Sequence, residues 1–126
     1  MLLLSRYRGI FIRLTFDWDD TSLEEDLAKA GIKELKVRFP DNYIYCRISS
    51  SGEGLHLVIS DSNEKIMPTD FTDEEVIQHR TDFLTLGLEC GGRLRTDLRR
   101  KAVGTQWGRL FSVKGEKSCG AWFLVE

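Results

Sequence analysis

Residues 13–20, RLTFDWDD, place the carboxylates of Asp17 and Asp19 two positions apart at the end of an alternating apolar segment. Every second side chain of a strand points to the same face, so an extended backbone would put both carboxylates on one face. Adjacent carboxylates repel each other unless a positive charge lies between them, and Mg²⁺ prefers such oxygens while leaving positions open for phosphates. We predict that Asp17 and Asp19 hold Mg²⁺ or Mn²⁺. The alternative is a strand-to-helix corner, where Asp is favoured in turns and caps.

A serine- and glycine-rich segment, residues 49–54, precedes a strand that carries His56. Small residues let backbone amides approach an anion closely, and hydroxyl groups add hydrogen-bond donors. We predict that Ser51, Gly52 and Gly54 bind phosphate. His56 would either donate to a triphosphate or titrate near neutral pH. The alternatives are a flexible hairpin loop and a half-buried strand histidine without a functional role.

Positive charge gathers in residues 93–117, which hold eight basic and two acidic residues in a chain of net charge −2. Arginine outnumbers lysine there, and guanidinium groups match the geometry of phosphate. The alternative is a solvated helix face. Asp97 is spaced to pair with the neighbouring arginines on a helix, so we predict that it organises them instead of binding metal. The predicted nucleic-acid contacts are Arg93, Arg95, Arg99, Arg100 and Lys114.

Alternation, helical periodicity and turn residues predict one α+β domain over residues 1–126, with a mainly antiparallel sheet and helices packed on one face. Strands are expected at 10–16, 36–39, 43–48 and 55–60. A helix that starts at a Ser22–Glu25 capping box and ends at Gly31 is expected first, with Leu23, Leu27 and Ala30 buried. Further helices are expected at 72–86, opening on a Thr72–Glu75 capping box, and at 93–103. Residues 109–114 and 121–125 are expected to form a C-terminal hairpin.

Composition is that of an ordinary globular domain, with 41% hydrophobic and 30% charged residues. The apolar run at residues 2–4 is too short for a signal peptide or a membrane span, which predicts a cytoplasmic protein without membrane contact. Cys46, Cys90 and Cys119 have no C-x-x-C spacing, which disfavours structural zinc. Reduced thiols are expected. The alternative, if the source is a hyperthermophile, is a Cys90–Cys119 disulfide.

Together these motifs resemble the archaeo-eukaryotic primase superfamily. Its first motif, two aspartates around one residue after a hydrophobic strand, matches Asp17 and Asp19, and its second matches Ser51, Gly54 and His56. The resemblance covers residues 10–60, and the basic C-terminal segment is similar to that of small primase-like proteins of archaeal viruses and plasmids.

The resemblance implies an RRM-like core that serves DNA replication, with the host cytoplasm as its location if the protein is viral. It also implies metal ions on Asp17 and Asp19, and His56 on the phosphates of an incoming nucleoside triphosphate. The reaction would then be metal-dependent nucleotidyl transfer.

One departure from the superfamily leaves catalysis open. Ser112 stands where a third acidic residue is expected, and Asp82, Asp97 and Glu116 are the candidate substitutes. The chain is therefore either an active nucleotidyltransferase or a relative that binds nucleic acid without turnover.

Two other functions remain alternatives. The first is a non-catalytic RNA- or DNA-binding module that stacks bases on Phe11, Tyr43 and Tyr45 of its sheet. The second is a small structural or interaction protein, in which Phe111, Trp122 and Phe123 form a homodimer interface.

Overall fold

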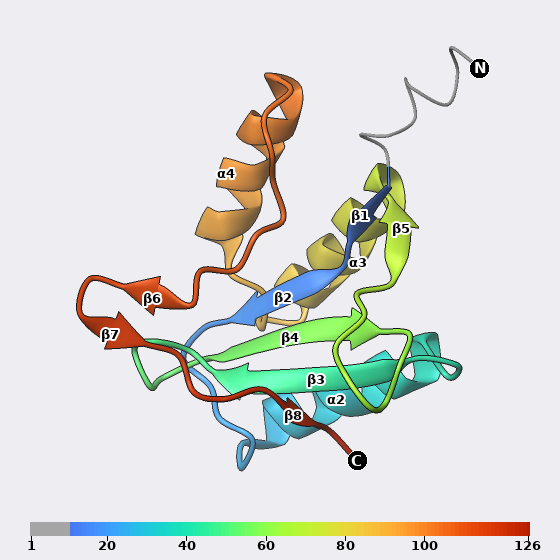
Figure 1. The fold of residues 1–126 in the computed structure, drawn as a ribbon, viewed down its shortest axis with the longest axis vertical. Helices are drawn as coiled ribbons and strands as arrows, with labels where there is room; N and C mark the ends of the chain where they lie inside the picture. Colours follow the sequence, from blue (N-terminus) through green and yellow to red (C-terminus); the bar gives the residue numbers. More distant parts are fainter. Residues whose placement is uncertain (1–10) are drawn as a thin grey trace.

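The computed structural model describes residues 11–126, which form an α+β fold around a four-stranded sheet (Figure 1). Its strands are β2 (Thr15–Trp18), β3 (Tyr43–Ile48), β4 (Leu55–Ser60) and β8 (Phe123–Leu124). They lie in the order β2-β4-β3-β8, and every neighbouring pair is antiparallel. The predicted mainly antiparallel α+β architecture is confirmed.

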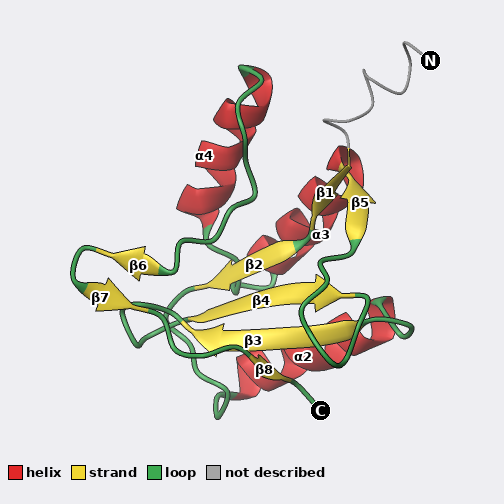
Figure 2. Ribbon diagram, viewed as in Figure 1, coloured by secondary structure: helices red, strands yellow, loops and turns green. Residues whose placement is uncertain are grey.

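Two short strand pairs and three helices complete the described fold (Figure 2). Strand β1 (Phe11–Arg13) pairs with β5 (Asp70–Thr72), and β6 (Val113–Lys114) pairs with β7 (Lys117–Ser118). The helices are α2 (Asp26–Arg38), α3 (Asp73–Thr85) and α4 (Gly91–Ala102). Among the described residues, no helix has the length and apolar character needed to cross a membrane.

The core lies between the sheet and the two helices α2 and α3, which Figure 1 shows behind the strands. Phe16 and Trp18 alternate onto this face of β2 and are fully buried. The Trp18 ring stacks on Phe83 of α3, with the ring centroids 5.6 Å apart. Alternation therefore sends the side chains between them, including Asp17, to the opposite face of the sheet.

Helix α2 differs from the prediction because Gly31 lies inside it. A Cβ atom at Gly31 would stand 2.5 Å from Leu88 Cδ1 and 2.8 Å from Trp18 Cη2, so glycine is required where the helix crosses the sheet. The helix continues to Arg38, and the strand predicted at 36–39 is wrong.

The start of α2 also differs, since its N-cap is Glu25 and no side chain bonds to its first turn. The predicted Ser22–Glu25 capping box is therefore wrong. The later start rotates the buried face onto Ala28 and Leu35. Leu27 and Ala30 are exposed, and Leu23 is partly buried against the core.

The strand predicted at 10–16 is two strands that separate at Leu14 and join different sheets, and Ile10 lies outside the described residues. The predicted hairpin of 109–114 with 121–125 is also wrong. Strand β6 pairs with β7 instead, and β8 adds to the edge of the main sheet beside β3. The second predicted helix, residues 72–86, is confirmed as α3 with its Thr72–Glu75 capping box.

Candidate functional site

A cavity of about 540 Å³ opens on the polar face of the sheet, and we call it the carboxylate pocket. Residues at the end of β2, in the 49–54 turn, at the start of α4 and in the segment leading to β6 surround it. Seven predicted site residues line this one cavity: Asp17, Asp19, Ser51, His56, Arg93, Arg100 and Lys114. Four other predicted residues lie outside its lining: Gly52, Gly54, Arg95 and Arg99.

Asp17 lies on β2 and Asp19 directly follows it, so the polar face ends in two neighbouring acids. One potential ligand atom each from Asp17, Asp19 and Cys90 lie within 4.8 Å of one another. Burial, and then the charge of Asp19, raise the pKa of the Asp17 carboxyl above its ordinary value. In the described part of the chain, no lysine or arginine forms an ion pair with either acid.

The backbone of Asp17 forms two hydrogen bonds with the connection between α3 and α4. Its N–H group donates to Glu89 Oε1 at 2.8 Å, and its carbonyl accepts from the N–H group of Cys90 at 2.8 Å. These bonds fix the free edge of β2, so the carboxylate projects from a rigid strand. Cys90 also caps α4, since its sulfur accepts from the Arg93 N–H group.

His56 stands opposite Asp17 in the β2–β4 ladder and is 7% exposed. Its Nδ1 atom accepts a hydrogen bond from Arg47 Nε at 3.1 Å, so the neutral ring carries its proton on Nε2. That atom lies 3.6 Å from Asp17 Oδ1. Burial and the charges of Arg47 and Arg93 lower the pKa of His56 to about 4, which makes it a neutral donor at physiological pH and not a group that titrates near 7.

The 49–54 turn brings serine hydroxyls to the pocket, while its glycines shape the backbone. Ser49, Ser50 and Ser51 line the cavity. A Cβ atom at Gly54 would lie 2.7 Å from the Trp18 carbonyl and 3.6 Å from Asp19 Cα, so glycine lets the turn approach the end of β2. Gly52 has a positive φ of 77° and open space around it. These two glycines serve the turn geometry.

Helix α4 presents one face to the cavity, formed by Arg93, Thr96 and Arg100 at positions i, i+3 and i+7. Arg93 is mostly buried and donates to Thr15 Oγ1 at 2.6 Å, so it connects α4 to β2. The Arg100 side chain is 40% exposed, and its Nη1 atom lies 3.6 Å from Asp97 Oδ1. Arg95 and Arg99 are exposed on other sides of the helix, away from this pocket.

Asp97 organises arginines, as its helical spacing predicted. The Arg80 side chain is fully buried and bonds to Glu89 Oε2 at 2.6 Å and to Asp97 Oδ2 at 2.8 Å. Arg93 Nη1 lies 3.4 Å from the same Glu89 oxygen. We call Arg80, Glu89, Arg93 and Asp97 the arginine cluster.

The candidate third acids do not complete the metal site. Asp97 belongs to the arginine cluster, and Asp82 pairs with Arg38 at 2.8 Å. Glu116 is exposed in the turn between β6 and β7. None of these three residues, nor Ser112, lines the carboxylate pocket.

The C-terminal segment covers the polar face of the sheet. The Gly108 carbonyl accepts from Thr15 Oγ1 at 2.9 Å, and the Phe111 carbonyl accepts from Arg47 Nη2 at 3.3 Å. Tyr45 is only 7% exposed, while Tyr43 is 39% exposed. The Phe11 side chain lies outside what the structure describes. A stacking platform that includes Tyr45 is therefore ruled out by burial.

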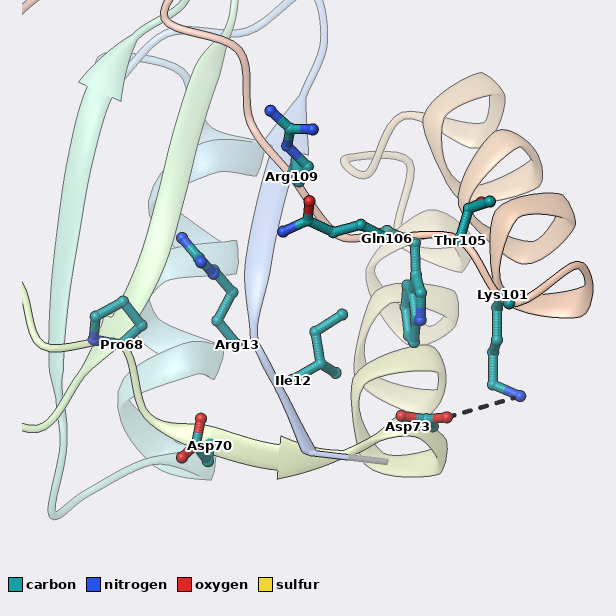
Figure 3. A pocket seen from close by; sticks show the side chains of 11 residues that line it. Ile12, Arg13, Pro68, Asp70, Asp73, Lys101, Thr105, Gln106 and Arg109 are labelled. Carbon is teal, nitrogen blue, oxygen red and sulfur yellow. Dashed lines mark ion pairs between the residues drawn. The ribbon is translucent and has the colours of Figure 1, made fainter. Parts of the chain in front are cut away.

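Figure 3 shows a second and larger cavity of about 790 Å³, between β1, β5 and the segment that follows α4. Arg13, Asp70 and Gln106 project toward it, and Asp73 pairs with Lys101 across one end at 3.8 Å. Its two acids are not among the described residues that converge on a common cation position. We therefore take the smaller carboxylate pocket as the candidate site, because the potential ligand atoms of Asp17, Asp19 and Cys90 converge there.

Comparison with protein-family models, curated proteins and solved structures gave no match.

Sequence reasoning missed four residues that line or support the pocket: Arg47, Cys90, Arg109 and Phe111. A signal for Arg47 was present, because the short turn after residue 48 fixes a register that pairs Arg47 with His56. Cys90 carried no such signal, since its position depends on the α3–α4 connection. The predicted alternative of a Cys90–Cys119 bridge is not formed, and all three cysteines are free.

Proposed function

We propose that this chain binds a nucleoside triphosphate or the end of a nucleic acid through a divalent cation, as a primase-like protein does. The observation that carries the proposal is the convergence of Asp17, Asp19 and His56 on one cavity whose other side is basic. The carboxylates would hold Mg²⁺ or Mn²⁺. Arg100, Lys114 and the serine hydroxyls would contact the phosphates.

The donor set fits such a cation. Mg²⁺ binds oxygen at roughly 2.0–2.1 Å, so its ligand atoms lie no more than about 4.2 Å apart. The candidate atoms lie within 4.8 Å of one another, so a small side-chain rotation would bring both carboxylates onto one ion. Burial raises the pKa of the Cys90 thiol, so it is protonated at neutral pH and a poor ligand for a hard cation. The two carboxylates therefore carry the proposed site. A bound cation would offset both the burial and the Asp19 charge that raise the pKa of Asp17.

The chain's own groups suit a phosphate once the cation is present. Because Arg47 occupies Nδ1, His56 carries its proton on Nε2, which lies 3.6 Å from Asp17 Oδ1 at the phosphate side of the pocket. The first turn of α4 contributes Gly92 to the lining, and the positive end of a helix dipole favours anions. Arg100 and the exposed Lys114 would supply positive charge from the cavity lining.

We expect this chain to bind nucleotide and to catalyse nucleotidyl transfer weakly. When bound, the cation would supply charge neutralisation and activation of an attacking oxygen. Two-metal nucleotidyl transfer needs further ligands, and the pocket lining offers only Asp17 and Asp19 as carboxylates. We expect nucleotide affinity to be the stronger signature and primer extension to be weak.

The test is triphosphate binding by calorimetry with and without Mn²⁺, alongside primer extension on a single-stranded template. We expect Asp17→Asn with Asp19→Asn to lower the Mn²⁺-dependent affinity for ATP at least tenfold. Asp20→Asn is the matched control, because Asp20 adjoins the same segment, is exposed and does not line the pocket.

The contrary result is equally clear. Mn²⁺-dependent affinity that is unchanged in the double variant, or ATP affinity that does not respond to Mn²⁺ in the wild type, would rule out the proposed site. Primer extension undiminished in the double variant would rule out the catalytic role of these acids. A homodimer remains a prediction, for which light scattering is the direct measurement.

A further inference from the structure

One aromatic side chain at the carboxylate pocket is exposed beyond what packing explains. Phe111 is 56% exposed, the highest value among the aromatic residues that the structure describes as exposed, and it lines the pocket. An exposed phenyl ring has unfavourable contact with water and gains free energy when an apolar surface covers it. Its position therefore points to a ligand with a flat apolar face.

The backbone beneath this ring is fixed. The Phe111 carbonyl accepts hydrogen bonds from Arg47 Nη2 at 3.3 Å and from Cys119 Sγ at 3.4 Å. Arg47 in turn lies over the Trp122 ring at 4.4 Å and donates to His56. The same side chain thus holds His56 and the carbonyl of Phe111, so the backbone that carries the ring keeps a fixed place relative to the predicted phosphate contacts.

The surroundings of the ring are those of a base-stacking site. Arg109 also lines the pocket, and its guanidinium carbon lies 5.5 Å from the centroid of the Phe111 ring. Aromatic rings and guanidinium planes are the groups on which proteins stack nucleobases. The volume of about 540 Å³ falls within the range of small-molecule sites, roughly 300–1,000 Å³.

From these observations we infer that Phe111 is the stacking platform for the base of the nucleotide whose phosphates the carboxylate pocket binds. The inference rests on the proposed function and deepens it, since it makes the ligand a nucleotide and not a bare polyphosphate. Stacking uses the face of the base and makes little distinction between bases, so the site accepts any of the common nucleobases.

The experiment compares ATP with inorganic tripolyphosphate in the presence of Mn²⁺, using the full chain. We expect Phe111→Ala to weaken ATP binding by about 5- to 150-fold, the range typical for loss of one base–aromatic stack, and to leave tripolyphosphate affinity unchanged. Phe111→Trp should keep or strengthen ATP binding. The matched control is Phe123→Ala, an exposed aromatic of β8 outside the pocket.

The outcomes separate the two proposals. Unchanged ATP affinity in Phe111→Ala, or an equal loss for ATP and tripolyphosphate, overturns the stacking role while the metal–phosphate site stands. A wild type that binds neither ligand with Mn²⁺ overturns the proposed function itself. Thermal unfolding of each variant shows that the compared proteins are folded.

Discussion

Two pairs of carboxylates meet at the end of β2, and their surroundings are opposite. Glu89 and Asp97 are buried and are bonded to the fully buried Arg80. Asp17 and Asp19 face a cavity and, among the described residues, form no ion pair with lysine or arginine. The backbone of Asp17 is nevertheless bonded to Glu89, so one pair is the support of the other.

This contrast indicates which carboxylates can bind a ligand or a cation. A buried carboxylate with an arginine partner has its lone pairs satisfied and serves stability. Asp17 is partly buried beside a second carboxylate, and burial first and the charge of Asp19 second raise its pKa, so a nearby cation would stabilise its charged form. The proximity of the two pairs predicts that variants in the first will alter the second, while the reverse effect is small.

The largest expected effect comes from Arg80→Met. It removes the cation shared by Glu89 and Asp97, and breaking a buried ion pair costs about 3–5 kcal/mol of unfolding free energy. Urea unfolding measures it, with Asp82→Asn as the control, since that residue belongs to a more exposed pair with Arg38. A loss no larger than that of the control would mean that the arginine cluster does not support β2.

A slightly smaller effect is expected for His56, which lies beside Asp17 but whose pKa is lowered by burial and then by the charges of Arg47 and Arg93. Its pKa is lowered from 6.5 to about 4, so its contribution to stability is complete above pH 6.5 and is lost as pH falls through 4. That contribution is on the order of 3 kcal/mol. The difference in unfolding free energy between wild type and His56→Gln should shrink as pH falls from 6.5 to 4. The titration of His79 occurs in both proteins, so its effect cancels in this difference. A constant difference would contradict the buried, neutral imidazole.

The two glycines of the 49–54 turn offer a matched pair. Gly54→Ala places a Cβ against the Trp18 carbonyl, and we expect it to cost about 1–3 kcal/mol and to weaken Mn²⁺-dependent ATP binding because Asp19 moves. Gly52→Ala meets only the strain of a positive φ, about 1 kcal/mol, with unchanged affinity. Equal effects of the two variants on ATP affinity would show that this turn does not position Asp19.

The smallest effect is expected for Asp17→Asn without metal. The raised pKa of Asp17 means that its contribution to stability is present below pH 3.8 and is lost as pH rises through the folded-state value. At pH 7 the variant should therefore be more stable than wild type, by less than about 1 kcal/mol. Saturating Mn²⁺ and ATP should reverse the order, since only the wild type gains from binding. Thermal unfolding in both conditions measures the sign.

Local patterns predicted the parts of the fold that depend on near neighbours. Strands β3 and β4 have the predicted bounds, and the short turn between them fixes their register. The predicted capping box at Thr72 forms because its atoms lie within one helical turn. Gly31 misled the prediction because its neighbours, Trp18 and Leu88, come from other elements.

The candidate site divides in the same way. The sequence alone predicted that Asp17 and Asp19 lie at the end of one strand, that His56 lies on another, and that a basic helix comes later in the chain. Alternation and helical periodicity are local properties, so these features can be predicted without the tertiary fold. The tertiary structure was needed to show that these elements surround one cavity and that Phe111 lines it. It was also needed to show that Arg80, and not a metal ion, bonds to Glu89 and Asp97. Those outcomes depend on contacts between distant segments, whose energies come from burial and charge pairing that no local pattern encodes.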